Sequence, residues 1–544
     1  MMRIFSAAGA IVLSIACTTG FAQSDAISNS TANTFRIAGT VVNAVTGGPV
    51  RGATVAVLAV EDSHRIAAVQ SGNDGRFDIE GLSAAKYQLI VSKRGYSTAA
   101  YDEHEEFSSA VVTGEGLDTG NLVFRIVPGA VLRGVITADG GDPVAQAQVM
   151  LFQKPRGHQP GGRIVQVDTA LTDDTGVYEF ANLAKGEYLL AVKAEPWYAL
   201  HRGGARQRGA GETNQALDMA YPITYFDSTT DEASASPIAL VGGSRVEADI
   251  SLHAEAALHL DVQAQRKQDG SIARPELRQA VFGISVSNDS AGFADATQTG
   301  GTEFSGVAPG HYELTQGDPP RVVALDAAAS QQVEPGAGTP AVAVSGTLQT
   351  ATSAPLTGEA VVTLEPVDGA QGFKPKVSEF NHGAFSFAAV PAGAWKLRVE
   401  QSGLQTPVFS IAVGGRAHQG GLVTVQDRPL TLLVRVSADG MRVEGFARKG
   451  EKGLAGVMVL LIPKDAAAFP DFVRRDQSDS DGSFVLRDVA AGQYTVVAIE
   501  DGWGLDWTRP EVIGRYLPGG IAVRVTDTLD KMVRLAGPVA VQER

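Results

Sequence analysis

The sequence predicts an all-β protein, built as a tandem array of about five antiparallel β-sandwich domains. The first observation is a turn-and-aromatic motif that recurs five times along the 544 residues. The second is the composition, with 62 glycines, 44% apolar residues and only 19% charged residues, which is typical of a globular and turn-rich chain. The third is a series of short apolar alternations, about seven per hundred residues, without a sustained helical period.

The motif is described by counting from the glycine of its first turn. Apolar or aromatic residues stand two, four, seven, twelve and fourteen positions later, as in Phe77, Ile79, Leu82, Tyr87 and Leu89 after Gly75. The five glycines are Gly75, Gly176, Gly300, Gly383 and Gly482. Position twelve is aromatic in every copy, although the third copy is degenerate and has Thr302 at position two. Aromatics are 7% of the chain, so independent placement would give this about once in a million sets.

Each part of the motif has a structural explanation. The glycine allows a tight turn with positive φ, and positions two and four share one face of the strand that follows. After a second tight turn, positions twelve and fourteen again point the same way, into a core. An apolar element from Pro49 to Val55 recurs upstream of the other copies at a similar distance. Because the motif glycines are 83 to 124 residues apart, we predict whole domains arranged as beads on a string.

The repeats divide the chain. Residues 1–22 are predicted to be a signal peptide and 23–34 a linker. The five sandwich repeats are predicted at 35–127, 128–253, 254–340, 341–428 and 429–544. The second repeat carries two loop insertions, at 153–163 and 198–225, and the third is degenerate.

These motifs resemble a known domain family. Pro49 to Val55, the Asp74-Gly75-Arg76-Phe77 turn, the Leu82 to Leu89 segment and Lys93-Arg94-Gly95-Tyr96 are similar to the carboxypeptidase regulatory-like domain. That family is a transthyretin-like sandwich related to Cna B-like and carbohydrate-binding-like modules. The resemblance implies an accessory fold of exported and cell-envelope proteins, often grouped with carbohydrate-binding folds. It implies no catalysis, because the family is named for a domain beside a peptidase, and this chain carries no recognisable peptidase domain.

The N-terminus predicts export. Arg3 precedes an apolar run at 4–16, and Gly20-Phe21-Ala22 offers small residues for cleavage after Ala22. The only cysteine, Cys17, leaves lipidation open as an alternative. No later stretch has the roughly 18 apolar residues of a transmembrane segment, and the formal charge of -15 argues against a nucleic-acid partner. We expect a secreted, periplasmic or cell-envelope protein.

The sequence contains no recognisable catalytic or metal motif, so we expect a non-enzyme without a cofactor. None of the nine histidines begins a His-x-x-Glu or His-Glu-x-x-His pattern. His104 lies in an acidic stretch that we interpret as a solvated loop. Residues 477–482 with Asp488 resemble part of a calcium loop, but Gln477 stands where such loops have Asp, so we interpret them as the repeat turn. A cleft that joins acids and histidines of different modules remains an alternative.

Candidate binding residues are those that the copies do not share. Trp197 and Trp503 stand nine residues after position twelve, where other copies also have a large side chain, so we expect both to belong to the fold. Long loops on a rigid sandwich are where binding groups concentrate. The candidates outside the shared pattern are Trp507, Arg509 and Tyr516, and in the second insertion Arg202, Arg206 and Arg208.

These observations predict an exported, non-catalytic, multi-domain structural or binding protein. Basic and aromatic loops at module ends would suit a carbohydrate or another cell-envelope polymer, with adhesion as one consequence. The alternative is an accessory subunit of an exported peptidase or an outer-membrane receptor, with an envelope protein as the partner.

Overall fold

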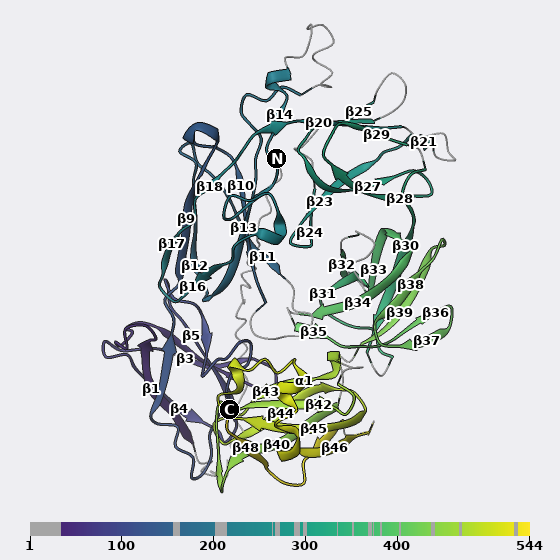
Figure 1. Ribbon diagram of the computed structural model, residues 1–544. Helices are drawn as coiled ribbons and strands as arrows, with labels where there is room; N and C mark the ends of the chain where they lie inside the picture. Colours follow the sequence, from purple (N-terminus) through teal and green to yellow (C-terminus); the bar gives the residue numbers. More distant parts are fainter. Residues whose placement is uncertain are drawn as a thin grey trace, which may run out of the picture.

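The computed structural model describes residues 34–155, 164–201, 215–263, 265–266, 272–287, 294–296, 302–334, 336–350, 353–367, 373, 375–380, 383–401, 404–436, 441–466, 470–526 and 531–544. Its secondary structure is nearly all β-strand, and the described residues contain one short α-helix, α1 (Pro510–Ile513). Figure 1 shows the strands grouped into five modules in chain order. The predicted fold class, a tandem array of β-sandwich domains, is confirmed.

The five modules share one plan of two packed sheets. In the first sheet, the module's first strand lies beside the strand that carries motif positions two and four, and the two are antiparallel. On its other side lies the module's last strand, and this pair is parallel. The second sheet contains the strand with position twelve and is antiparallel in modules 1 to 4. In module 5 the strand β48 (Val539–Gln542) pairs in parallel with a strand of each sheet and joins the two. The parallel pair of the first sheet differs from the purely antiparallel sandwich that we expected, because the last strand returns through a crossover rather than a hairpin.

The first two modules contain β1 to β18. Module 1 has β1 (Phe35–Asn43), β2 (Thr54–Ala59), β3 (Arg65–Gln70), β4 (Arg76–Leu82), β5 (Lys86–Ser92), β6 (Ala99–Ala100), β7 (Val111–Val112) and β8 (Leu122–Ile126). Module 2 has β9 (Ala130–Thr137), β10 (Gln148–Gln153), β11 (Val165–Leu171), β12 (Val177–Leu183), β13 (Gly186–Lys193), β14 (Met219–Ala220), β15 (Thr224–Tyr225), β16 (Ile238–Leu240), β17 (Arg245–Glu247) and β18 (Ile250–Ser251), with 3-10 turns at Asp139–Gly141, Gln215–Leu217 and Glu232–Ser234.

The remaining modules contain β19 to β48. Module 3 has β19 (Glu255–Ala256), β20 (Leu258–Val262), β21 (Gln265–Arg266), β22 (Ile272–Ala273), β23 (Glu276–Val281), β24 (Ile284–Ser287), β25 (Ala294–Ala296), β26 (Thr302–Val307), β27 (Gly310–Gln316), β28 (Arg321–Ala327) and β29 (Gln331–Val333). Module 4 has β30 (Thr339–Gln349), β31 (Ala360–Pro366), β32 (Lys376–Phe380), β33 (Ala384–Pro391), β34 (Gly393–Gln401), β35 (Leu404–Thr406), β36 (Val408–Val413), β37 (Arg416–Gln419), β38 (Leu422–Val425) and β39 (Leu430–Val436). Module 5 has β40 (Met441–Lys449), β41 (Lys452–Gly453), β42 (Met458–Pro463), β43 (Arg474–Gln477), β44 (Ser483–Val489), β45 (Gly492–Ile499), β46 (Ile521–Val525), β47 (Met532–Arg534) and β48 (Val539–Gln542), with α1 and 3-10 turns at Pro470–Phe472, Gly502–Gly504 and Leu517–Gly519.

Each module has its own hydrophobic core. The five large clusters of buried apolar side chains draw on residues 37–126, 130–252, 258–333, 342–436 and 441–539. One cluster runs past a boundary that the sequence suggested: β39 pairs with β30 and packs in the core of module 4. Module 4 therefore extends beyond residue 428, where we had expected module 5 to begin.

Position twelve of the motif has a polar role as well as an apolar one. In every module its buried ring donates a hydrogen bond to the backbone carbonyl four residues earlier. The donor and acceptor residues are Tyr87 and Ser83 (3.1 Å), Tyr188 and Ala184 (2.8 Å), Tyr312 and Ala308 (2.7 Å), Trp395 and Pro391 (2.9 Å), and Tyr494 and Ala490 (2.9 Å). The aromatic thus holds the second tight turn against the core.

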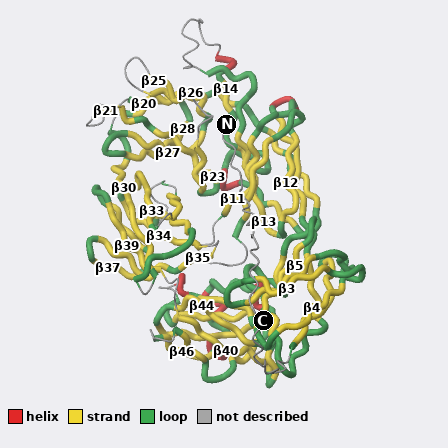
Figure 2. The backbone as a smooth tube through the Cα atoms, turned by 180° about the vertical axis from the view of Figure 1, so that it is seen from behind, coloured by secondary structure: helices red, strands yellow, loops and turns green. Residues whose placement is uncertain are grey.

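The modules close into a ring rather than extending as beads on a string. The front and back views both show module 1 beside module 5, although these are the most distant modules in sequence (Figure 1, Figure 2). Modules 3 and 4 share one continuous sheet through β28 and β30. Modules 2 and 3 meet at an apolar cluster in which Phe282 packs between Phe152 and Tyr225, with 5.1 Å between ring centroids in each pair.

Candidate functional site at the module junctions

The junction that closes the ring is rich in polar contacts. Lys86 of module 1 lies 2.6 Å from the Asp479 carboxylate of module 5 and also donates to the Ser483 hydroxyl. Asp479 accepts a further hydrogen bond from the backbone N–H of Ala110. Burial raises the pKa of the Asp479 carboxyl, although Lys86 opposes this effect. The motif turn of module 5 is thus a docking element for module 1.

Arg475 is the most enclosed charged group of this junction, and its side chain is 4% exposed. Its guanidinium lies 2.8 Å from the carboxylate of Glu105 and 3.2 Å from that of Glu106, both in module 1. It also lies over three aromatic rings, those of Phe107, Trp503 and Trp507. Ion pairing and cation–π contact combine here in a site that water hardly reaches.

The two stretches that resembled metal sites both belong to this junction. The His104 ring stacks on Trp503, with 5.4 Å between centroids and 8° between planes, and contacts the Gln477 side chain at 3.0 Å. Asp481 accepts hydrogen bonds from the N–H and hydroxyl of Ser483. Asp488 adopts a positive φ of 52° beside the β-bulge of β44. His104 and Gln477 thus help to hold module 1 to module 5, whereas the hydrogen bonds of Asp481 and Asp488 lie within module 5.

Of the three candidates near the C-terminus, two pack onto the outer face of module 5. Trp507 is 6% exposed and packs, with Tyr516 at the edge, against the β42 and β45 side chains Met458, Leu460, Ile462, Val497 and Ile499. Arg509 is exposed and pairs with Asp506 at 2.7 Å. An indole enclosed in this way offers no open face for stacking, so a binding role here would fall to Arg509 and the rim of Tyr516.

The second insertion is described only at its two ends. Arg202, Arg206 and Arg208 lie outside the described residues. At the near end Trp197 is 91% exposed, which corrects our expectation that it belongs to the fold as Trp503 does. The far end, with β14, is bound to module 3.

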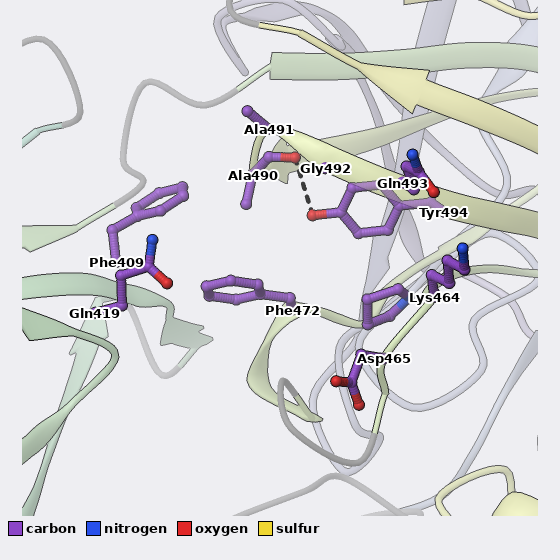
Figure 3. A pocket seen from close by; sticks show the side chains of 11 residues that line it. Phe409, Gln419, Lys464, Asp465, Phe472, Ala490, Ala491, Gly492, Gln493 and Tyr494 are labelled. Atoms are coloured by element: carbon purple, nitrogen blue, oxygen red, sulfur yellow. Dashed lines mark hydrogen bonds between the residues drawn. The ribbon is translucent and has the colours of Figure 1, made fainter.

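A cavity of about 300 Å³ lies between modules 4 and 5 (Figure 3). Its walls include Phe409, Phe472 and Tyr494, and Lys464 and Asp465 lie at its rim (Figure 3). The Phe409 and Phe472 rings are 5.6 Å apart and come from opposite modules. Such a space has room for a single small ring with polar substituents.

Among the described residues, no group of three or more His, Cys, Asp or Glu side chains is placed to share a metal ion. No helix in the described part of the chain is both long and apolar enough to cross a membrane. Acids and histidines of different modules do meet, at the junction of modules 2 and 3, where His201, Asp218, His259 and Glu303 form one hydrogen-bonded cluster.

The fold and these junctions define a ring of accessory-type sandwich modules. Residues 36–117 and 131–217 match the family model described as carboxypeptidase regulatory-like domain. Most of module 1 and the first part of module 2 thus match the family that the sequence resemblance predicted. No curated protein matches the chain.

Several solved structures resemble the chain at low identity. The Bacillus anthracis TIE protein is 11% identical over 74% of this chain and 75% of that chain, with a TM-score of 0.18. A streptococcal ancillary pilin is 11% identical over 56% of this chain and 98% of that chain, with a TM-score of 0.21. The minor pilin of Streptococcus agalactiae is 12% identical over 40% of this chain and 95% of that chain, with a TM-score of 0.20. At these scores the likenesses carry no functional argument.

Sequence reasoning missed the residues that close the ring. Arg475, Glu105 and Glu106 drew no attention as a set because they are about 370 positions apart in the chain. The available signal was that module 5 carries Trp507 and the Arg474-Arg475 pair outside the repeat pattern. Aromatics and arginines that a repeat does not need are common at protein interfaces.

Proposed function

We propose that this protein is an exported, non-catalytic scaffold of the cell envelope that binds a carbohydrate at an exposed tryptophan surface, made of Trp197, Tyr198 and Leu200. The observation that carries the proposal is the 91% exposure of Trp197. The other three tryptophans are engaged: Trp395 and Trp507 are buried, and Trp503 donates to the Gly456 carbonyl. The accessory character of carboxypeptidase regulatory-like domains supports the absence of catalysis, and the predicted signal peptide supports export.

The geometry of this surface suits a sugar ring. The Trp197 and Tyr198 rings are perpendicular, at 89°, with 5.8 Å between centroids. Leu200 is exposed beside them. An exposed indole face packs well against the C–H face of a pyranose, while the polar edges of the sugar stay in water. Stacking of this kind needs no charge, so the proposal concerns the sugar ring and not an ionic polymer.

The test is binding of the purified mature chain to a panel of soluble glycans and envelope polysaccharides, measured by affinity electrophoresis and calorimetry. Trp197→Ala should lose at least about tenfold in affinity, which corresponds to about 1.4 kcal/mol. Leu422→Ala is the matched control, because Leu422 is an exposed apolar side chain of module 4. If no glycan binds, or if Trp197→Ala binds as the unchanged protein does, the carbohydrate proposal fails. Only the proposed scaffold role then remains.

A second candidate, an accessory subunit with a protein partner, is favoured by the edge strand β11. Its only strand partner among the described residues is β10. Val165, Val167 and Leu171 alternate along it and are all at least 43% exposed. An exposed apolar edge is a template for strand addition by another chain.

This candidate predicts capture of an envelope protein by the immobilised chain. Val167→Lys should abolish capture, because a lysine on an edge strand blocks strand addition. Val45→Lys, a change at an exposed turn residue of module 1, is the control and should leave capture intact. Capture that survives Val167→Lys would remove β11 as the binding element.

A further inference from the structure

Five side chains form one hydrogen-bonded chain at the junction of modules 2 and 3, and we name it the histidine clamp (Glu195, His201, Asp218, His259 and Glu303). His201 lies between two carboxylates, with Nε2 3.1 Å from Glu195 and Nδ1 2.9 Å from Asp218. His259 also lies between two, with Nε2 2.7 Å from Asp218 and Nδ1 2.9 Å from Glu303. Glu195, His201 and Asp218 belong to module 2, and His259 on β20 and Glu303 on β26 to module 3.

The arrangement fits the charged form of both imidazoles. A neutral imidazole has one N–H donor and one acceptor nitrogen, whereas the charged form has two donors. In each histidine both ring nitrogens face carboxylate oxygens, and a carboxylate can only accept. Loss of a proton would therefore set a nitrogen lone pair against a carboxylate, at a place where His201 is 6%, Asp218 12% and His259 18% exposed.

The charged groups around the clamp also favour the charged form of the imidazoles. No lysine or arginine of the described residues forms an ion pair with Glu195, Asp218 or Glu303. Asp261 of β20 lies opposite Glu303 in the β20–β26 pair and adds a further acid to the same face. Glu195 has the largest effect in raising the pKa of His201 above its usual range, burial opposes it, and Asp218 adds to it. Among the described residues, the two imidazoles are thus the positively charged groups that balance this cluster of carboxylates.

The clamp lies where the second insertion attaches to module 3. β14 of the insertion pairs with β19 through Met219 and Ala256, and the N–H of Ala257 donates to the carbonyl of Asp218. The His201 ring packs on Gly306 of module 3, where a Cβ would come within 2.6 Å of it. A second contact between these modules is the apolar cluster at Phe282, where the Phe282 N–H also donates to the Glu232 carboxylate. No histidine side chain of the described residues hydrogen-bonds in this second contact. Protonation of the histidines therefore changes the attachment at the clamp and leaves the attachment at Phe282 unchanged.

We propose that His201 and His259 form a proton-binding site that fastens the β14 segment of module 2 onto module 3 and releases it as the pH rises. The stabilisation is fully present below the unfolded-state histidine pKa of about 6.5 and is lost as the pH rises through the higher folded-state pKa. His201 lies shortly after Trp197, Tyr198 and Leu200 in the chain, so release of the clamp changes the surroundings of the tryptophan surface. The clamp itself does not depend on carbohydrate binding.

The first experiment measures the protonation states directly. In the full chain with ¹⁵N-labelled histidine, two of the nine histidines should keep both ring nitrogens protonated at a pH where the others are neutral. Asp218→Asn removes a carboxylate from both imidazoles and should lower the titration of His201 by at least about one pH unit. Asp139→Asn is the control, because Asp139 pairs with a histidine outside the clamp, His253, and accepts from the Ala254 N–H at an exposed site, so it should leave the His201 and His259 signals unchanged.

The second experiment measures release. Hydrogen-exchange protection of β14 and β19, corrected for the intrinsic rate at each pH, should fall at least about tenfold between about pH 6 and about pH 9. β42 and β45 in module 5 should keep their protection. His259→Gln should show low protection of β14 and β19 at every pH, and His253→Gln should behave as the unchanged protein.

Two outcomes would overturn the proposal. One is that His201 and His259 titrate with the exposed histidines. The other is that both stay charged at neutral pH while the protection of β14 and β19 does not change with pH, in which case the cluster is a static ion pair. Variants that fail to fold are distinguished by β42 and β45, whose protection must be retained for the comparison to count.

Discussion

At the residue scale, the aromatic at position twelve shows how far sequence reasoning reaches. The repeat predicted that this ring lies in the core, and Tyr87, Tyr188, Tyr312, Trp395 and Tyr494 are all buried. The hydrogen bond to the carbonyl four residues earlier was not foreseen, although the sequence carries its signal. Phenylalanine, with 21 copies, outnumbers the 11 tyrosines and 4 tryptophans together, yet it never occupies this position. Phenylalanine is excluded because the ring at this position must also donate a hydrogen bond, which a phenyl ring cannot do.

The hydrogen bond can be measured in module 5. Tyr494→Phe keeps the packing but leaves the Ala490 carbonyl without its donor, so we expect a loss of about 1 kcal/mol in the free energy of unfolding. Urea unfolding followed by tryptophan fluorescence reports on this module, because Trp503 and Trp507 lie in it. Tyr516→Phe, a change on the outer face of the same module, should alter stability by less than about 0.5 kcal/mol. Equal effects of the two variants would contradict the role assigned to the tyrosine.

At the scale of the strand pair, the structure shows a pairing that the sequence pattern had hidden. In four modules the first strand has a glycine directly opposite the aromatic at motif position two. The pairs are Gly39 and Phe77, Gly134 and Tyr178, Gly346 and Phe385, and Gly445 and Phe484. In the degenerate third module the same position pairs Val262 with Thr302. The aromatic ring covers the glycine, so a larger side chain on one strand is paired with a smaller one on the other strand.

This pairing predicts energetic coupling between the two positions. A Cβ at Gly346 would lie 2.5 Å from the Phe385 ring and 2.7 Å from the Leu432 carbonyl oxygen, so Gly346→Val alone should destabilise module 4 by about 2 to 3 kcal/mol. Phe385→Thr alone should also destabilise it, by about 3 kcal/mol, through lost burial. Combined, the changes recreate the pair of module 3, and the double variant should be more stable than the sum of the single effects by at least about 1 kcal/mol. Additive effects in denaturant unfolding would refute the coupling.

The insertions show why elements outside the repeat resisted prediction. Composition made 198–225 a candidate binding loop, and in its described part His201 and Asp218 contact module 3. The 3-10 turns and α1 after β45 likewise cover the outer face of a sheet, where Trp507 and Ile513 are buried. A single sequence shows which residues the repeats do not share. It does not show whether such residues face solvent or a neighbouring module, because that depends on contacts between distant segments.

At the scale of the whole molecule, five domains could be counted from the sequence but the ring could not be predicted. Closure depends on the angles at four successive junctions, and no motif encodes them. The residues that close the ring occur once each and lie in different modules. An example is Arg475 of β43, which faces Glu105 and Glu106. The edge strand β43 is covered by module 1 at this junction, whereas the corresponding edge β11 of module 2 remains exposed. Closing the ring therefore protects one edge strand and leaves another open for a partner.

Ring closure should depend on Arg475. Arg475→Glu places a third acid beside Glu105 and Glu106 in a nearly water-free site, and disrupting a buried ion pair of this kind costs about 3 to 5 kcal/mol. We expect modules 1 and 5 to separate, which small-angle X-ray scattering would record as a larger radius of gyration and maximum dimension. Each module keeps its own core, so the strand content measured by circular dichroism should not change.

Two further variants decide whether the ion pairs themselves close the ring. Arg524→Glu makes the same charge change at an exposed position of β46 and should leave the scattering curve unchanged. Arg475→Glu combined with Glu105→Arg restores opposite charges across the junction and should return the curve towards that of the closed ring. Because the pairs are shielded from water, added salt should open the unchanged protein much less than Arg475→Glu does. A closed Arg475→Glu variant would mean that the Lys86 and Asp479 contacts, together with the Phe107 and Trp503 rings, suffice to hold the first and last modules together.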